Sequence, residues 1–221
     1  MGTVVYDLDG TLADTSKDLI IAANKALEIL GHAPPLDPIE DARTAFHGGR
    51  AMLRLAAQRL AASDHGALVE EGYPIFLDAY DAEIATFSML YPGAVDSAHR
   101  LMAEGYRVAI CTNKPEALAR KLLDKLQIDT VFPALIGADT LPVRKPDPEP
   151  YRAAVALAGG DPARSLLVGD TVTDRETARA AGVPSVLVTF GPAGTSVADL
   201  APEALLDHFD DLPAIAARLL R

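Results

Sequence analysis

Two aspartates near the start of the chain are candidates for chemistry. Asp7 and Asp9 follow an apolar run of strand-forming residues, 4–6, and Gly10 then breaks the pattern. Alternation along a strand would put both carboxylates on one side, at the carboxyl end where open α/β sheets bind ligands. A solvated Asp-Gly turn is the simpler interpretation. Two like charges at a buried strand end, however, need a cation to neutralise them, so the pair indicates a metal-binding or proton-transferring site.

Two later segments carry groups that can bind an anion. Thr112 and Asn113 follow the apolar run 107–111, which is typical of a buried strand. The Thr112 hydroxyl can donate to a phosphoryl oxygen and Asn113 can add a donor; a helix N-cap explains the pair equally well, and helix N-termini bind phosphate. Lys145 lies in a proline-stiffened loop, as a surface lysine or as a cation that neutralises an anion, and its neighbour Arg144 competes for that second role.

Asp170 and Asp174 supply two further carboxylates. Asp170 comes directly after the short apolar run 165–168, so we expect its side chain at the same sheet edge as Asp7. Together these two acids offer hard oxygen ligands, which suit Mg²⁺. Asp174 lies at the start of a predicted helix, where an acid commonly caps the backbone.

Four segments, taken in order, resemble the four motifs of the haloacid dehalogenase superfamily of phosphotransferases, and in particular its phosphoglycolate-phosphatase-like branch. A single match would carry little weight, but the four occur in the family's order and span nearly the whole chain. The matching segments are Asp7-Leu8-Asp9-Gly10-Thr11-Leu12, Thr112-Asn113, Lys145-Pro146-Asp147-Pro148 and Gly169-Asp170-Thr171-Val172-Thr173-Asp174.

The resemblance implies a role for each of these polar residues. It makes Asp7 the nucleophile that forms an aspartyl-phosphate, and Asp9 the acid and then the base for the hydrolytic water. Lys145 would neutralise both the nucleophile and the phosphate. The resemblance implies that Mg²⁺ is held by the carboxylates of Asp7 and Asp170 and by the backbone carbonyl of Asp9, and that Asp174 orients Lys145 or a metal-bound water. The residues expected to bind the phosphate are Gly10, Thr112, Asn113 and Lys145.

The function implied by this resemblance is Mg²⁺-dependent hydrolysis of a small phosphate monoester, most specifically 2-phosphoglycolate. Asp9 argues against a haloacid dehalogenase or phosphonate hydrolase, because those relatives lack an acid at this position. Thr11 resembles the phosphatases, whereas the sugar-phosphate mutases usually carry Val there. A sugar-phosphate mutase and a pyrophosphatase remain alternatives, as does a non-catalytic binding protein on the same fold.

These residues need a sheet to position them, and the periodicity predicts one. Apolar runs at 107–111, 131–136, 165–168 and 185–189 alternate with helical stripes, which indicates a mostly parallel sheet with helices on both faces, as in Rossmann-like α/β folds. We expect this core to be discontinuous, formed by residues 1–13 and 86–221. Pro133 places the segment 131–136 at an edge or in an irregular strand.

Residues 14–85 show helical patterns without a convincing strand, and they predict an inserted helical domain. The pattern predicts helices over about 19–30, 38–45, 52–60 and 68–84. The resemblance implies that this insertion is a cap over the active site. In its loop His47-Gly48-Gly49-Arg50, Arg50 is our candidate for binding a substrate carboxylate, although Arg50 and Arg54 also fit a solvated helix face.

Composition limits the partners. A net charge of -11 argues against nucleic acid or an anionic membrane surface, but not against a small phosphorylated metabolite. Cys111 is the only cysteine, so no internal disulfide forms, and its apolar neighbours indicate a packing residue. The chain has no membrane-spanning stretch or secretory pattern, so we expect a cytoplasmic protein that is a monomer or a homodimer.

Overall fold

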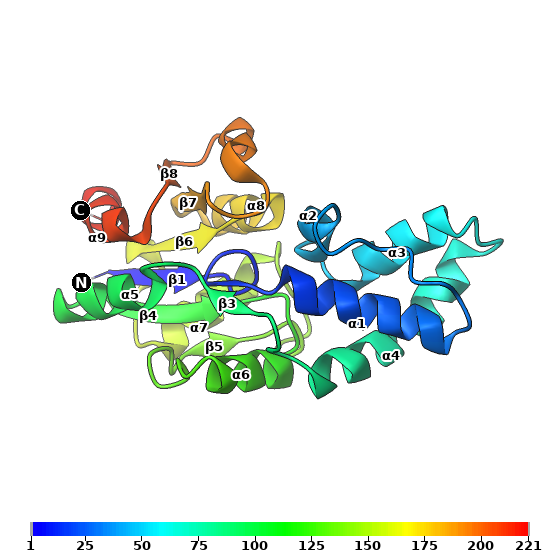
Figure 1. Ribbon diagram of the computed structural model, residues 1–221. Coiled ribbons are helices and arrows are strands. Elements are labelled where there is room, and N and C mark those ends of the chain that lie inside the picture. Colours follow the sequence, from blue (N-terminus) through cyan, green and yellow to red (C-terminus); the bar gives the residue numbers. More distant parts are fainter. Residues whose placement is uncertain (1, 221) are drawn as a thin grey trace. The chain divides into compact units, whose positions relative to one another are not determined.

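Strand β1 (Thr3–Tyr6) is fully buried and lies inside a six-stranded parallel sheet (Figure 1). In the computed structural model, which describes residues 2–220, β1 pairs with β4 (Arg107–Cys111) on one side and with β6 (Ser165–Gly169) on the other. A strand buried on both sides needs a continuous apolar run, which Val4, Val5 and Tyr6 supply. The sheet order is β5 (Leu135–Ile136), β4, β1, β6, β7 (Ser185–Val188) and β8 (Ala204–Leu206).

Alternate residues of β1 pack on opposite faces of the sheet. Val5 belongs to a buried cluster with Tyr151 and Val155 of α7 (Pro148–Leu157) and with Ala178 of α8 (Val172–Ala181). Tyr6 points the other way, and its ring lies 5.5 Å from that of Phe132 and 6.4 Å from that of Phe209. Helices therefore cover both faces, and the predicted fold class is confirmed. The remaining helices of this unit are α5 (Ala94–Ala103), α6 (Glu116–Lys125), α9 (Leu212–Leu219) and the short 3₁₀ turns η1 (Pro162–Arg164), η2 (Gly194–Leu200) and η3 (Phe209–Asp211).

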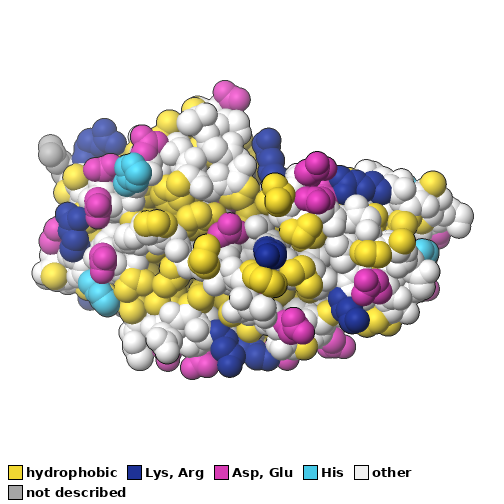
Figure 2. Space-filling model, in the orientation of Figure 1, with side chains coloured by type: hydrophobic (Ala, Val, Ile, Leu, Met, Phe, Trp, Pro, Cys, Tyr) yellow, Lys and Arg dark blue, Asp and Glu magenta, His cyan; other side chains and the backbone are white. Residues whose placement is uncertain are grey.

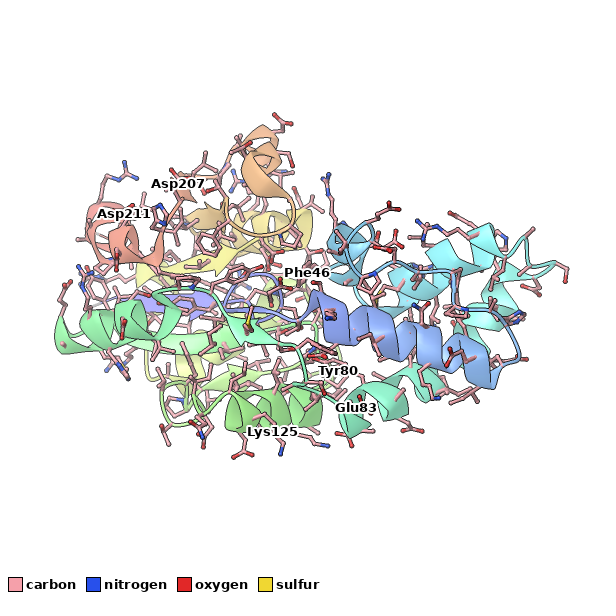
Figure 3. The ribbon with its side chains drawn as sticks, in the orientation of Figure 1. Phe46, Tyr80, Glu83, Lys125, Asp207 and Asp211 are labelled. Atoms are coloured by element: carbon pink, nitrogen blue, oxygen red, sulfur yellow. The ribbon has the colours of Figure 1, made fainter. Side chains whose placement is uncertain are left out.

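The chain forms two units, and the second one, Thr15–Met89, is helical. Helix α4 forms the core of this unit and packs against α1 and α3. Its residues Phe76 and Tyr80 stack with their ring centroids 6.2 Å apart (Tyr80 is labelled in Figure 3). Pro74 lies inside α4 without ending it. The helices are α1 (Ser16–Ile29), α2 (Ala42–Ala45), α3 (Gly49–Arg59) and α4 (His65–Ala82).

The second unit extends a few residues beyond the expected boundary at 85. The reason is Asp18, a buried carboxylate on α1 that accepts hydrogen bonds from the backbone N–H groups of Phe87 and Ser88 and from the Ser88 hydroxyl. These bonds tie the end of the unit to its first helix. Short strands β2 (Ala13–Asp14) and β3 (Met89–Leu90), which the sequence did not predict, pair as a separate two-stranded sheet.

Three other predictions of secondary structure were wrong: one helix and one strand are shorter than predicted, and one strand was not predicted. The helix expected over 38–45 is reduced to α2, because the Asp37 side chain accepts from the N–H groups of Ile39 and Glu40 and forms a turn instead. The strand expected over 131–136 is only β5, since Pro133 has no N–H to donate to the ladder. Strand β8 was not predicted: with three residues it is too short to show a period.

The surface carries charges of both signs. On the face seen in Figure 2, acidic and basic side chains are interspersed among apolar ones. No described helix combines the length and the apolar composition that crossing a membrane requires.

One ion pair inside the helical unit leads to a stability prediction. The buried carboxylate of Asp41 accepts hydrogen bonds from both terminal nitrogens of the Arg59 guanidinium and from the N–H of Asp37. The Arg59 hydrogen bond is the main cause that lowers the pKa of Asp41 below its ordinary value. A carboxyl with a lowered pKa in the folded state stabilises the fold above its unfolded pKa, and this contribution is lost as the pH falls through the folded pKa.

We therefore expect Asp41→Asn to lower the free energy of unfolding by about 1–2 kcal/mol at pH 7, because one hydrogen-bonded charge is removed from a partly exposed pair. Urea titrations at pH 7 and pH 3 measure the effect. The difference in unfolding free energy from the unmodified protein should narrow as the pH falls below about 4, the ordinary pKa of an aspartate, toward the lowered pKa of folded Asp41. Glu40→Gln, at the exposed neighbouring position, is the matched control. A difference that stays the same at both pH values would show that the charge is not what stabilises the unit.

Candidate active site

The first motif leaves the sheet through a tight loop. Strand β1 ends at Tyr6, and the N–H of Asp7 donates to the Val168 carbonyl (2.8 Å), which carries the ladder one step further. The Asp7 carboxylate then accepts from the N–H of Leu8 at 2.7 Å. Gly10 has a φ of 81°, a conformation that side chains other than glycine rarely adopt, and its N–H donates to the Ala13 carbonyl. The loop therefore fixes Asp7 at the strand end and turns the chain back within four residues.

Three acidic side chains meet at this edge of the sheet. Asp7 and Asp170 lie at the ends of neighbouring strands β1 and β6, and Asp174 lies in the first turn of α8. A carboxylate oxygen from each can be found within 4.8 Å of the other two. Asp170 also accepts a hydrogen bond from the Thr11 hydroxyl at 3.0 Å. Thr11, which the sequence analysis used only to separate family branches, thus orients one of the acids.

Lys145 lies between two of these acids. Its Nζ is 3.1 Å from Asp7 Oδ1 and 2.7 Å from Asp174 Oδ1, and the residue is 3 % exposed. A buried ammonium that contacts two carboxylates is a structural cation, not a surface lysine, whereas its competitor Arg144 is exposed. The sequence-based preference for Lys145 agrees with this placement.

Asp174 is occupied by protein donors. Besides Lys145, its carboxylate accepts from the N–H and the hydroxyl of Thr171, which closes a capping box at the start of α8, and from the N–H of Asp170. Asp174 therefore both caps α8 and contacts Lys145. With this many donors, Asp174 is better suited to positioning Lys145 than to holding a metal ion.

The three buried acids differ in the direction of their pKa shifts. Burial raises the pKa of Asp7 to about 7, with Lys145 opposing the shift and Asp174 and Asp9 adding to it. Burial, together with the charges of Asp174 and Asp7, holds the pKa of Asp170 well above its ordinary value. The pKa of Asp174 is lowered, because Lys145 and Thr171 outweigh the cost of its burial. Near neutral pH, Asp7 and Asp170 therefore favour a cation that can replace their protons.

The Thr112-Asn113 pair lies at the end of β4, at the same edge of the sheet. The N–H of Thr112 donates to the Ile136 carbonyl, and its hydroxyl accepts from the N–H of Lys114 at 3.1 Å. The Asn113 amide donates to the Lys145 carbonyl at 3.0 Å, so this side chain holds the loop that carries Lys145. Phosphate binding remains a prediction for three of these residues, Thr112, Asn113 and Gly10.

One residue of this site was missed by the sequence analysis. The side chain of Lys114 is 4 % exposed, and its Nζ lies 2.9 Å from Asp9 Oδ1. Asp9 is thus paired with a lysine, and its charge also acts on Asp7. The available signal is the position of Lys114 directly after Thr112-Asn113, at the end of a predicted strand.

Arg50, the candidate of the helical unit, already has partners there. It forms an ion pair with Glu70, and its guanidinium lies over the ring of Tyr73, 4.2 Å from the centroid. Its side chain remains 33 % exposed. A cation held by an exposed acid and a ring is ordered but accessible, so Arg50 stays a candidate for binding an anion.

The chain is similar to known proteins over nearly its whole length. The model of the haloacid dehalogenase-like hydrolase family matches residues 1–182. A protein of Mesorhizobium japonicum named phosphoglycolate phosphatase is 41% identical to this chain over 226 residues, covering 99% of this chain and 96% of the relative. A Caulobacter vibrioides protein of the same name is 40% identical and covers 99% and 92%. A crystal structure of a predicted phosphoglycolate phosphatase from Haemophilus somnus superposes with a TM-score of 0.85 at 26% identity, covering 97% of both chains.

Proposed function

Because the chain belongs to the haloacid dehalogenase-like hydrolases, we propose that it is a Mg²⁺-dependent phosphatase that hydrolyses a small phosphate monoester, specifically 2-phosphoglycolate. Membership of the family confirms the resemblance stated from the four motifs. The observation that supports the proposal best is the pairing of Lys145 with Asp7, since it places a cation at a carboxylate that is suited to attack a phosphoryl group. The choice of 2-phosphoglycolate rests on the names of relatives at about 40% identity over the full chain.

In the proposed reaction an oxygen of Asp7 attacks phosphorus while the ester oxygen leaves on the opposite side. Asp9 gives its proton to the leaving oxygen, and the Asp7 carboxylate becomes an aspartyl-phosphate. Asp9, now a carboxylate, takes a proton from water as the water attacks phosphorus, which releases inorganic phosphate and restores Asp7. Lys145 neutralises negative charge on Asp7 and on the phosphoryl oxygens throughout, and Asp174 keeps it there.

The donor set fits Mg²⁺. We propose that the carboxylates of Asp7 and Asp170 hold the ion with the backbone carbonyl of Asp9, since Mg²⁺ favours a few hard oxygen ligands together with substrate and water. The raised pKa of Asp7 and of Asp170 supports the same fit, because burial disfavours the charged form of each carboxyl group and a bound cation would offset that effect. A bound Mg²⁺ would supply charge neutralisation to the phosphoryl oxygens.

A substrate panel tests the function directly. We expect kcat/KM for 2-phosphoglycolate to exceed that for ethyl phosphate, which has the same two-carbon length but no carboxylate. p-Nitrophenyl phosphate should also be hydrolysed, because its leaving group needs little help. If none of the three esters is hydrolysed with Mg²⁺, the protein is not a phosphatase of this kind. If kcat/KM for ethyl phosphate equals that for 2-phosphoglycolate, the substrate assignment is wrong.

The helical unit would then supply specificity as a cap, and Arg50 is its leading candidate. We expect Arg50→Ala to lower kcat/KM for 2-phosphoglycolate, because the substrate carboxylate would take the place of Glu70 on Arg50. The loss should correspond to about 1–3 kcal/mol of transition-state stabilisation, the scale of one charge-assisted hydrogen bond. Ethyl phosphate has no carboxylate to lose and should be hydrolysed as before. Arg54→Ala, one turn further along α3 on an exposed position, is the matched control. Equal losses for both esters would make Arg50 a purely structural residue.

A further inference from the structure

Lys114 is a second buried lysine at the sheet edge, and the roles proposed above for the four motifs do not use it. Its backbone is fixed on both sides: the N–H donates to the Thr112 hydroxyl, and the carbonyl accepts from the N–H of Ala138 at 2.9 Å. The side chain is 4 % exposed, and its Nζ lies 2.9 Å from Asp9 Oδ1. A lysine loses solvation and side-chain freedom on such burial, so its position calls for a specific partner.

We propose that Lys114 is a positioning residue that orients the carboxyl group of Asp9 toward the leaving-group oxygen. This inference rests on the function proposed above. Asp9 lies three residues beyond the end of β1, outside the regular ladder, so the strand does not fix its side chain. Lys114 comes from the loop after the neighbouring strand β4 and supplies that constraint at one carboxylate oxygen.

The step that Lys114 assists is the transfer of one proton. As the bond between phosphorus and the ester oxygen breaks, its electron pair leaves with the oxygen, and that oxygen takes the proton from Asp9. A new bond forms between Asp7 and phosphorus, so the phosphoryl group moves and no further reactant is needed. Proton transfer demands a donor within hydrogen-bond reach, and a misplacement of about 1 Å costs roughly 100-fold.

The dependence on the leaving group distinguishes this role from phosphate binding. An alkoxide is a poor leaving group and needs the proton, whereas p-nitrophenolate leaves without it. We expect Lys114→Met to lower kcat/KM for 2-phosphoglycolate and ethyl phosphate by about 10- to 100-fold, and for p-nitrophenyl phosphate by less than about 3-fold. Equal losses for all three esters would show that Lys114 binds the phosphoryl group, and a loss confined to 2-phosphoglycolate would show that it binds the substrate carboxylate. Either result overturns the proposal.

A double-mutant cycle tests whether Lys114 acts through Asp9. In an Asp9→Asn background the proton donor is gone, so adding Lys114→Met should cause almost no further loss in kcat/KM for ethyl phosphate. Full additivity would contradict the proposal. Lys114→Arg, which keeps the charge, should recover part of the activity, and it replaces Lys114→Met in the cycle if thermal unfolding shows that the Met variant does not fold. Lys125→Met, near the end of α6 and exposed, is the control.

The controls separate this inference from the proposed function. The contrast between ethyl and p-nitrophenyl phosphate does not depend on 2-phosphoglycolate being the substrate. If the unmodified enzyme hydrolyses phosphate esters but shows no preference for 2-phosphoglycolate, the substrate assignment fails and the Lys114 test still stands. If the unmodified enzyme prefers 2-phosphoglycolate but Lys114→Met lowers kcat/KM equally for all three esters, only the inference about Lys114 fails.

Discussion

Asp7→Asn should abolish turnover, with kcat for p-nitrophenyl phosphate at least about 1,000-fold lower, because an amide is a far weaker nucleophile than a carboxylate. The change is nearly isosteric. The Asn oxygen can still accept from the N–H of Leu8, and Lys145 keeps its 2.7 Å contact with Asp174. We therefore expect the variant to fold, which near-native thermal unfolding would show. Rates are measured on the purified variant at saturating Mg²⁺.

A second measurement identifies the covalent step. In acid-quenched unmodified enzyme, mass spectrometry should find phosphate on the peptide that contains Asp7, and the variant should lack it. Asp124→Asn, the same chemical change at an exposed position on α6, is the matched control and should leave the rate unchanged. Substantial turnover by folded Asp7→Asn, or phosphate on another peptide, would remove Asp7 from the nucleophilic role.

The two acids of the first motif show how far strand periodicity predicts this site. Strand β1, its burial and the position of Asp7 at its end followed from the apolar run before them. The same alternation puts Asp9 on the side of Asp7, and the Asp9 charge does act on Asp7. Strand β1 nevertheless ends at Tyr6, and Asp9 lies outside it, in an isolated bridge to Ala13. A period of two applies only while the ladder continues, and the sequence does not mark where the ladder stops to within two residues.

Residues far apart in sequence could be brought together only by the order of the strands. That Asp170 would come near Asp7 was predictable, because both directly follow buried strands of one parallel sheet. The Lys114 contact with Asp9 was not, since a lysine next to Thr112-Asn113 has the same local pattern whether it is buried or solvated. Only the pairing of β4 with β1 puts the two on neighbouring loops. The local sequence predicted that Asp174 could cap a helix start, but not that Thr171 completes a capping box with it. The contact of Asp174 with Lys145 was implied only by the family resemblance.

Removing the metal should have the second large effect. We expect EDTA to lower phosphatase activity by more than about 100-fold and added Mg²⁺ to restore it, because neutralising the phosphoryl oxygens is worth several kcal/mol in the transition state. Ca²⁺ should inhibit, since its larger and more flexible shell allows both oxygens of Asp7 to bind and spoils the line of attack. Full activity in a metal-free preparation would contradict the proposed cofactor.

The pH dependence of Mg²⁺ binding gives a readout that does not depend on turnover. Burial raises the pKa of Asp7 to about 7 and that of Asp170 above its ordinary value, so both hold protons that a cation must displace. Mg²⁺ affinity, measured by calorimetry, should therefore fall as the pH drops from 8 to 6, and proton release should appear as a dependence of the heat on the buffer. Asp170→Asn should weaken binding strongly, and Asp124→Asn should not. Mg²⁺ binding that is independent of pH over this range, or unchanged in Asp170→Asn, would place the ion elsewhere.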